Sequence, residues 1–152
     1  MSSRFAVVPA AYVLFLRTRD GRDEALMQLR RNTGYLDGHW TTAAAGHVEA
    51  GESVFDAARR EAEEEIGVTD LTLQPLCAMH RTYGDEPINQ RVDYFLRATE
   101  WRGEPTIREP QKCADLGWFP LDDLPDPVVP HELQVFDALR AGTLEPIVTH
   151  GF

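Results

Sequence analysis

The stretch that decides the fold is residues 46–68, GHVEAGESVFDAARREAEEEIGV. Ser53 and Asp56 have the spacing of a capping box, and Gly67 stands where a left-handed residue would end a helix. We therefore predict a helix from about Ser53 to Ile66. At roughly 100° per residue, one side of this helix is apolar and is expected to pack on a sheet. That side contains Val54, Phe55, Ala58, Ala62 and Ile66.

The same helix concentrates negative charge, with four glutamates among residues 61–65. Glu61, Glu64 and Glu65 fall within an arc of roughly 100° beside the apolar side, whereas Glu63 is expected to point to solvent. Like charges at this spacing destabilise a helix, and the helix dipole disfavours anions near its C-terminal end. The arrangement costs stability unless a cation occupies it. On charge alone, a solvated acidic face balanced by the neighbouring arginines is the alternative interpretation.

Residues 46–68 resemble the Nudix box, the signature of the Nudix (MutT-like) hydrolase family. The box reads Gly, five residues, Glu, seven residues, Arg-Glu, an aliphatic residue, any residue, Glu-Glu, any residue, Gly and an aliphatic residue. The resemblance implies a single Nudix domain over residues 1–152, with an α/β/α sandwich fold in which helices flank a mixed central sheet. The nine specified places are occupied by Gly46, Glu52, Arg60, Glu61, Ala62, Glu64, Glu65, Gly67 and Val68.

The resemblance also implies a chemistry. Nudix enzymes hydrolyse a nucleoside diphosphate linked to another group, X, and use Mg²⁺, with Mn²⁺ as a substitute. By resemblance the metal ligands are Glu61, Glu64 and Glu65, together with the backbone carbonyl of Ala45. Carboxylate and carbonyl oxygens are the ligands that the hard Mg²⁺ ion prefers. One carboxylate must also accept a proton from the attacking water, and Glu61 and Glu64 are the candidates within the box.

Three further features bear on the implied site. Arg60 resembles the family's arginine that orients neighbouring carboxylates by ion pairing, with Glu52 as a partner. Glu109, in REPQKC, is an alternative base, although a solvated loop residue is the simpler interpretation. The chain reads TTAAAG where the family usually has a proline and two glycines before the box, so residues 43–45 depart from the pattern. Alanine restricts φ relative to glycine, which leaves the geometry of the Ala45 carbonyl open.

The rest of the chain predicts strands on both sides of the central helix and a second helix near the C-terminus. A nearly continuous apolar run opens the chain, as in a strand that is covered on both faces. The order of strands, helix, strands and helix favours a mixed sheet between helices. The predicted strands are residues 5–16, 24–31, 71–82, 91–98 and a short one within 116–125, and the second helix is 130–142. The first two strands, joined by a turn at Gly21, are expected to form a hairpin.

Residues outside the box set the substrate. The segment CADLGWFPLDDLP resembles a strand and bend of MutT-like enzymes, which implies cleavage of a nucleoside triphosphate to a monophosphate and pyrophosphate. Alternatives are hydrolysis of another nucleotide, such as a dinucleoside polyphosphate or nucleotide sugar, and a non-catalytic nucleotide-sensing module. An isoprenyl diphosphate isomerase would need a cysteine in a motif that Cys77 and Cys113 lack. Candidate substrate-binding residues are Tyr35, Trp40, Arg81, Glu109 and Trp118.

The amino-acid composition limits the binding partners that we expect for this protein. The net charge of −10 argues against nucleic-acid binding, which needs lysine and arginine on a common face. We expect no membrane span, because no run of about 18 apolar residues occurs, and we predict a cytoplasmic location. The two cysteines are far apart without a metal-binding spacing and are predicted to be buried thiols. Nudix proteins are often dimers, so a homodimer is an alternative to a monomer.

Overall fold

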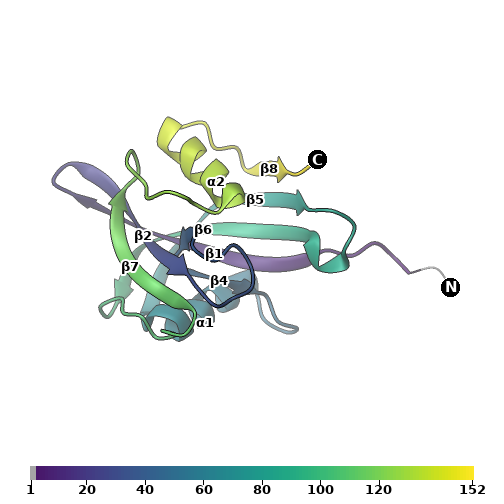
Figure 1. Ribbon diagram of the computed structural model, residues 1–152, viewed down its shortest axis with the longest axis horizontal. Helices are drawn as coiled ribbons and strands as arrows, with labels where there is room; N and C mark the ends of the chain where they lie inside the picture. Colours follow the sequence, from purple (N-terminus) through teal and green to yellow (C-terminus); the bar gives the residue numbers. More distant parts are fainter. Residues whose placement is uncertain (1–2) are drawn as a thin grey trace.

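The computed structural model describes residues 3–152 and shows a mixed sheet with one helix on each face (Figure 1). The sheet has eight strands within this range. In chain order the elements are β1 (Val8–Arg19), β2 (Arg22–Arg30), β3 (Trp40–Thr42), β4 (Ala44–His47), α1 (Val54–Ile66), β5 (Thr69–Thr82), the short 3-10 helix η1 (Pro87–Asn89), β6 (Gln90–Arg102), β7 (Cys113–Pro120), α2 (Pro130–Ala141) and β8 (Ile147–His150).

Strand β1 organises the sheet. The main strand order is β3-β2-β1-β6-β5-β8, with β4 paired to β1 and β7 paired to β2. Along its first half β1 pairs with β4, and along its second half it forms the predicted hairpin with β2. Its pairing with β6 is parallel, whereas β4 and β2 are antiparallel to it. The predicted mixed sheet between helices is therefore confirmed.

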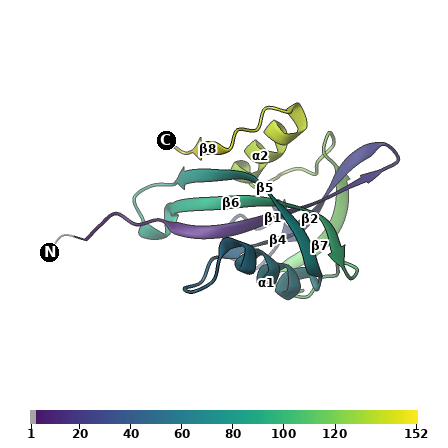
Figure 2. The ribbon, with the colours of Figure 1, turned by 180° about the vertical axis from the view of Figure 1, so that it is seen from behind.

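Helices α1 and α2 lie on opposite faces of this sheet, as the front and back views show (Figures 1 and 2). Residues Ala11, Val13 and Phe15 of β1 belong to the core cluster under α1. Tyr12 and Leu14 point the other way, into the cluster that includes Val135 and Phe136 of α2. Because successive side chains of a strand alternate between faces, both sets must be apolar, which explains the nearly unbroken apolar run.

Helix α1 begins and ends where the sequence predicts. The Ser53 side chain accepts a hydrogen bond from the Asp56 N–H (3.1 Å), and the Asp56 carboxylate accepts one from the Ser53 N–H (3.3 Å). Gly67 has φ of 72° and donates its N–H to the Glu63 carbonyl (3.1 Å). One packing prediction is wrong: Phe55 is 40% exposed, and Ala57 is buried instead. Phe55 lies in the first turn of α1, which the core does not cover on that side. Ala62 and Ile66 lie at nearly the same angle around the helix but further along it, where the core covers them.

Other predictions need correction at the strand ends. Strand β1 begins at Val8 and continues to Arg19, whereas Phe5 lies outside it and is 72% exposed. The short strands β3, β4 and β8 were not predicted, because runs of three or four residues are too short to show the alternating pattern of a strand. The thiols of Cys77 and Cys113 are buried and unbridged, as expected. Across residues 3–152, neither helix has the length and apolar character that a membrane crossing requires.

Candidate active site

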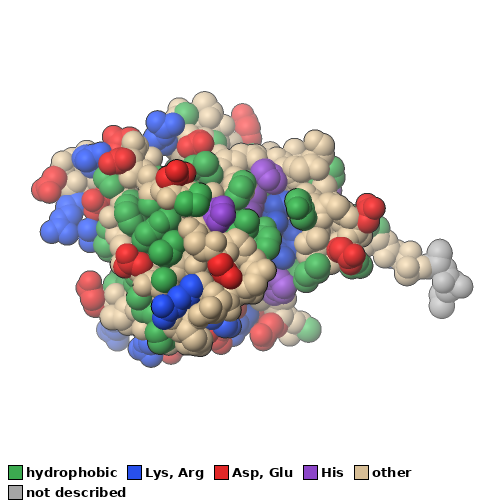
Figure 3. Space-filling model, in the orientation of Figure 1, with side chains coloured by type: hydrophobic (Ala, Val, Ile, Leu, Met, Phe, Trp, Pro, Cys, Tyr) green, Lys and Arg blue, Asp and Glu red, His purple; other side chains and the backbone are tan. Residues whose placement is uncertain are grey.

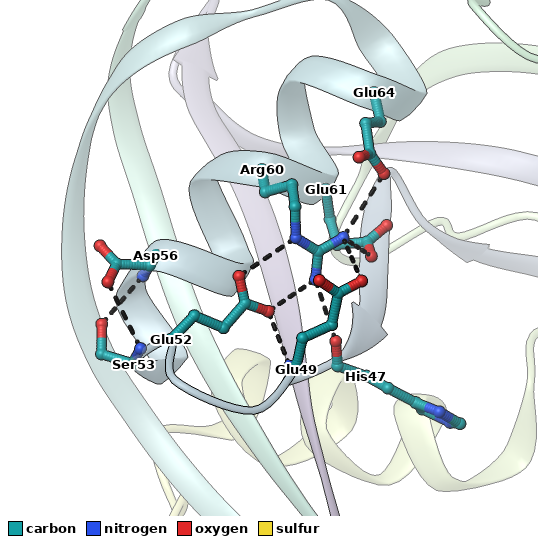
Figure 4. Close-up of polar contacts among 8 residues, drawn as sticks. All are labelled: His47, Glu49, Glu52, Ser53, Asp56, Arg60, Glu61 and Glu64. Atoms are coloured by element: carbon teal, nitrogen blue, oxygen red, sulfur yellow. Dashed lines mark hydrogen bonds and ion pairs between the residues drawn. The ribbon is translucent and has the colours of Figure 1, made fainter.

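Arg60 lies at the centre of a group of carboxylates where α1 meets β4 (Figure 4). Its guanidinium donates two hydrogen bonds to Glu52, from Nη2 (2.7 Å) and from Nε (3.1 Å). Nη1 donates to Glu61 (2.7 Å) and reaches Glu64 at 3.5 Å. Nη2 also donates to the backbone carbonyl of His47, at the end of β4 (3.1 Å). A bidentate arginine is geometrically restrictive, so Arg60 fixes the helix, the strand end and the loop between them to one another.

Glu61 lies flat against β4. Its side chain is only 14% exposed, and a Cβ atom at Gly46 would collide with its carboxylate. Gly46 has no positive φ, so glycine is needed here for space rather than for backbone conformation. Burial raises the pKa of Glu61, the Arg60 guanidinium opposes that shift, and the carboxylates of Glu64 and Glu109 add to it. Glu61 is therefore more easily held as a charged carboxylate when a cation lies beside it.

Glu65 lies deeper, between α1 and β4. Its carboxylate accepts the N–H of Ala45 (2.7 Å) and, more weakly, the side-chain amide of Gln28 (3.4 Å). Burial raises the pKa of Glu65 to about 8, and the charges of Glu61 and Glu109 contribute to the increase. In an extended strand the N–H and C=O of one residue point to the same side. The Ala45 carbonyl is therefore directed toward the side of β4 on which Glu65 lies.

The loop of residues 103–112 brings Glu109 to the same place. Its backbone extends the hydrogen bonding of α1, because Thr106 donates to the Ile66 carbonyl (3.0 Å) and Arg108 donates to the Glu65 carbonyl (3.1 Å). Glu109 thereby comes close enough to act electrostatically on the box glutamates. Glu109 thus belongs with Glu61, Glu64 and Glu65 to one acidic cluster, although 41 or more positions separate it from the box.

The predicted metal ligands lie on one side of α1, but their side chains do not converge. Among residues 3–152, no three His, Cys, Asp or Glu side chains are grouped as a ready metal-binding set. Instead Nη1 of Arg60 lies between Glu61 and Glu64, while Glu65 turns to the Ala45 N–H. The donors are nevertheless all oxygens, and their mutual repulsion is what a divalent cation would relieve. The chemistry of the set therefore fits Mg²⁺ or Mn²⁺.

A cavity of about 410 Å³ adjoins β4. Residues 45–47 form part of its wall, and the N-terminal turn of α2 forms another part through His131 and Glu132. Of the predicted substrate-binding residues outside the acidic cluster, Tyr35 and Arg81 line this cavity. The acidic cluster and the cavity thus share one short strand.

The two predicted tryptophans do not line this cavity, and each packs on other aromatic rings. Trp40 packs edge to face on Phe119, with ring centroids 4.9 Å apart. Trp118 stacks on Trp101 (5.9 Å) and lies under the Arg17 guanidinium (4.1 Å), in the core on the α1 face. The pairing of β7 with β2 sets these directions, because it turns alternate side chains of the Trp-Phe pair to opposite faces.

Sequence reasoning missed several residues of the cavity wall: Arg30, Arg91, His131 and Glu132. The polar residues of segment 91–97 gave a signal, since their alternation marked one side of β6 as charged. The alternation did not indicate that α2 covers this side of β6, where Asp93 is fully buried. Burial lowers the pKa of His131 to about 2, so its ring is neutral at physiological pH. Burial also raises the pKa of Glu132 to about 7, against the hydrogen bonds that Thr41 and Thr42 donate to it.

Comparisons with known proteins identify the family. A family model described as the NUDIX domain matches residues 7–139. The NAD-capped RNA hydrolase NudC of Pseudomonas aeruginosa (strain LESB58) is 30% identical over 131 residues, which cover 83% of this chain and 44% of that protein. The chain therefore spans less than half the length of this relative.

Two solved structures share the fold. The crystal structure of a MutT NUDIX hydrolase from Burkholderia pseudomallei superposes with a TM-score of 0.70 at 30% identity, covering 85% of this chain and 96% of that one. The NUDIX domain of Shewanella oneidensis NrtR, complexed with ADP ribose, gives a TM-score of 0.70 at 19% identity, covering 90% and 88%. At that lower identity the likeness shows the fold alone. The family model, the relatives and the fold together show that the chain belongs to the MutT-like Nudix hydrolase family.

Proposed function

We propose that this protein is a divalent-metal-dependent hydrolase that cleaves a nucleoside triphosphate to a monophosphate and pyrophosphate. The observation that carries the proposal is the shared strand β4. On one side of it lie the carboxylates of the box, and on the other lies a cavity lined by Arg30, Arg81 and Arg91. A nucleotide that lies across β4 would place the phosphoanhydride that is cleaved near the carboxylates and groups attached to it in the cavity.

Glu61, Glu64, Glu65 and the Ala45 carbonyl are the groups that would hold Mg²⁺, with Mn²⁺ as a substitute. The bound cation neutralises charge on phosphate oxygens and lowers the pKa of a bound water. The direction of the Ala45 carbonyl supports its place in this set, even though alanine replaces the family's usual glycine.

The chain's own residues provide orientation and proton transfer. Arg60 holds Glu61 against Gly46 and is itself held by Glu52, so its role is to position carboxylates. Glu61 and Glu64 are the candidates for the base that accepts the proton of the attacking water. The Glu64 side chain is 55% exposed and open to water, whereas Glu61 is more enclosed. Glu109 is the third candidate, because the loop of residues 103–112 brings it to the cluster.

In the cavity, Tyr35 and Arg81 are the residues proposed to contact the substrate. The Tyr35 side chain is 49% exposed and its ring lies 5.5 Å from the Arg30 guanidinium, which leaves aromatic surface for a base or sugar. Stacking on such a ring tolerates different bases, so it fixes a position rather than one base identity.

The alternative within the same chemistry is another nucleotide. The relative NudC acts, by its name, on NAD-capped RNA, and the NrtR domain holds ADP ribose. A nucleotide sugar or a dinucleoside polyphosphate would use the same carboxylates and differ only in what fills the cavity. A non-catalytic sensing module would bind the nucleotide and leave it intact.

A panel of nucleoside triphosphates, nucleotide sugars and dinucleotides, each with Mg²⁺ or Mn²⁺, tests the proposal through release of pyrophosphate, phosphate or a monophosphate. Glu64→Gln and Glu65→Gln should each abolish most of the turnover, while Glu63→Gln, which changes an exposed side chain of the same helix, should not. Unchanged turnover in Glu64→Gln and Glu65→Gln would refute the assigned site. Tight binding of a nucleotide by the wild type without turnover of any member would support the sensing module instead.

A further inference from the structure

Arg81 and Arg91 form a like-charged pair across two strands of the cavity wall. They are Cα partners in the antiparallel pairing of β5 with β6, and both line the cavity. Like charges directly opposite each other destabilise a sheet. One carboxylate lies between them: Asp93 Oδ2 accepts a hydrogen bond from Arg81 Nε (2.7 Å), and Asp93 Oδ1 lies 3.5 Å from Arg91 Nη2. The three groups together keep one positive charge.

The two guanidiniums also keep free hydrogen-bond donors. The Arg81 side chain is only 9% exposed, and within residues 3–152 its single hydrogen bond runs from Nε to Asp93. The Arg91 side chain is 13% exposed, and its enclosed Nε has no partner in the same part of the chain. Buried donors without partners are costly, and most buried polar groups in proteins are satisfied. Among the residues that the structure describes, Asp93 Oδ1 is not hydrogen-bonded either, although it lies 3.5 Å from Arg91 Nη2. Donors of both guanidiniums therefore remain free at the cavity wall.

Neither His131 nor Glu132, which also line this wall, is hydrogen-bonded to Arg81 or Arg91. His131 is neutral, and its Nε2 lies 3.8 Å from Asp93. Both carboxylate oxygens of Glu132 are taken by Thr41 Oγ1 (2.5 Å) and Thr42 N–H (2.8 Å). Arg30 adds a further positive charge. Figure 3 shows basic side chains beside histidines near the middle of one face of a chain whose net charge is −10.

We propose that Arg81 and Arg91 bind a phosphate group of the substrate that lies in the cavity, so that the protein selects nucleotides whose X is itself a phosphate over those whose X is a neutral sugar. This inference rests on the proposed function and names its substrate class. A phosphate offers only acceptors, carries negative charge and matches the planar donor face of a guanidinium. Asp93 would act as a positioning residue that holds both arginines and limits their net charge.

Direct binding is the first test. Inorganic pyrophosphate is titrated calorimetrically into the full chain in excess EDTA, where the carboxylate cluster carries no cation. Arg91→Gln should weaken binding about tenfold, as expected for loss of hydrogen bonds to a charged group. Asp93→Asn keeps an acceptor for Arg81 Nε and removes the opposing charge, so it should strengthen binding. The control is Arg97→Gln, because Arg97 lies on the same strand but lines a different cavity. Equal affinities in the wild type, Arg91→Gln and Asp93→Asn would overturn the proposal.

Substrate preference is the second test, and it separates a phosphate of the substrate from a free anion. With Mg²⁺, a nucleoside triphosphate is compared with the diphosphate glucose of the same nucleoside. Arg91→Gln should lower kcat/KM about tenfold for the triphosphate and leave the sugar nucleotide within about threefold. Weaker pyrophosphate binding with an unchanged preference would overturn the assignment to the substrate and place a free anion there.

The two proposals can fail separately. A wild-type protein that hydrolyses neither nucleotide would refute the hydrolase function, while the pyrophosphate titration would still decide the role of the arginine pair. Thermal unfolding of each variant shows whether it is folded before its affinity is interpreted. Arg81→Gln is the less suitable variant, because it removes the shortest contact of the buried Asp93.

Discussion

Substitution of Glu132 by glutamine should stabilise the protein at alkaline pH. Glu132 is 2% exposed and accepts hydrogen bonds from Thr41 Oγ1 and the Thr42 N–H. Its pKa is raised from 4.5 to about 7 by burial, so the folded state holds a proton that the unfolded state has already released. Glutamine has nearly the same shape, accepts from the Thr42 N–H and can donate to the Thr41 hydroxyl, and it carries no charge at any pH.

The magnitude follows from the pKa difference. Below about pH 4.5 the carboxyl is protonated in both states, and stability is unaffected by the group. Between about pH 4.5 and 7 the folded state binds more protons than the unfolded state, so stability falls as pH rises. With about 1.4 kcal/mol for each pKa unit, the loss reaches about 3 kcal/mol above pH 7. For a chain of this size that corresponds to a change in Tm of about 10 °C.

The assay is thermal and urea unfolding of the wild type and Glu132→Gln at several pH values from 4.5 to 8.5. The quantity of interest is the difference between the two proteins, because other titrating groups cancel in it. The difference should be small at the acid end and should grow in favour of the variant up to about pH 7. Glu63→Gln controls for the loss of one negative charge at an exposed position. A difference that does not change with pH, or a variant that is less stable at pH 8, would refute the reasoning.

Three further substitutions test the site and its support. Gly46→Ala should lower kcat by about a hundredfold with little change in Tm. The reason is that the new methyl group displaces the flexible Glu61 carboxylate rather than the backbone. Steady-state kinetics measure the change in kcat, and thermal unfolding measures Tm. Arg60→Lys should lower kcat/KM at least tenfold, since lysine keeps the charge but loses the bidentate geometry, whereas Arg59→Lys at the exposed neighbouring position should leave kcat/KM unchanged. Ser53→Ala should reduce the free energy of unfolding by about 1 kcal/mol through loss of the helix cap, and urea unfolding that shows no loss would contradict that role.

The features that could be predicted from the sequence depend on residues close together in the chain. The capping box at Ser53 and the left-handed Gly67 stand at opposite ends of α1. Each depends on residues within one helical turn, and both were predicted correctly. The hairpin of β1 with β2 is likewise local. The family resemblance rests on residues 46–68 alone, yet it indicated the fold of the whole domain.

The features that were missed depend on contacts between distant segments. Whether Phe55 is covered depends on how far the sheet extends beneath α1, and the direction of Trp118 depends on the pairing of β7 with β2. The arginine pair needs the register that places Arg81 opposite Arg91. The roles of the site residues, the cytoplasmic location and a second copy of the chain stay predictions.

The loop of residues 103–112 couples the motion of Glu109 to that of helix α1. The last carbonyl groups of an α-helix have no partner within the helix, and such ends commonly fray. Here the amides of Thr106 and Arg108 bond to two of those carbonyls, so the final turn of α1 and the loop must open together. Glu65 and Glu109 are then displaced in the same event. The exchange rate of these two amide hydrogens should therefore report how often the acidic cluster comes apart.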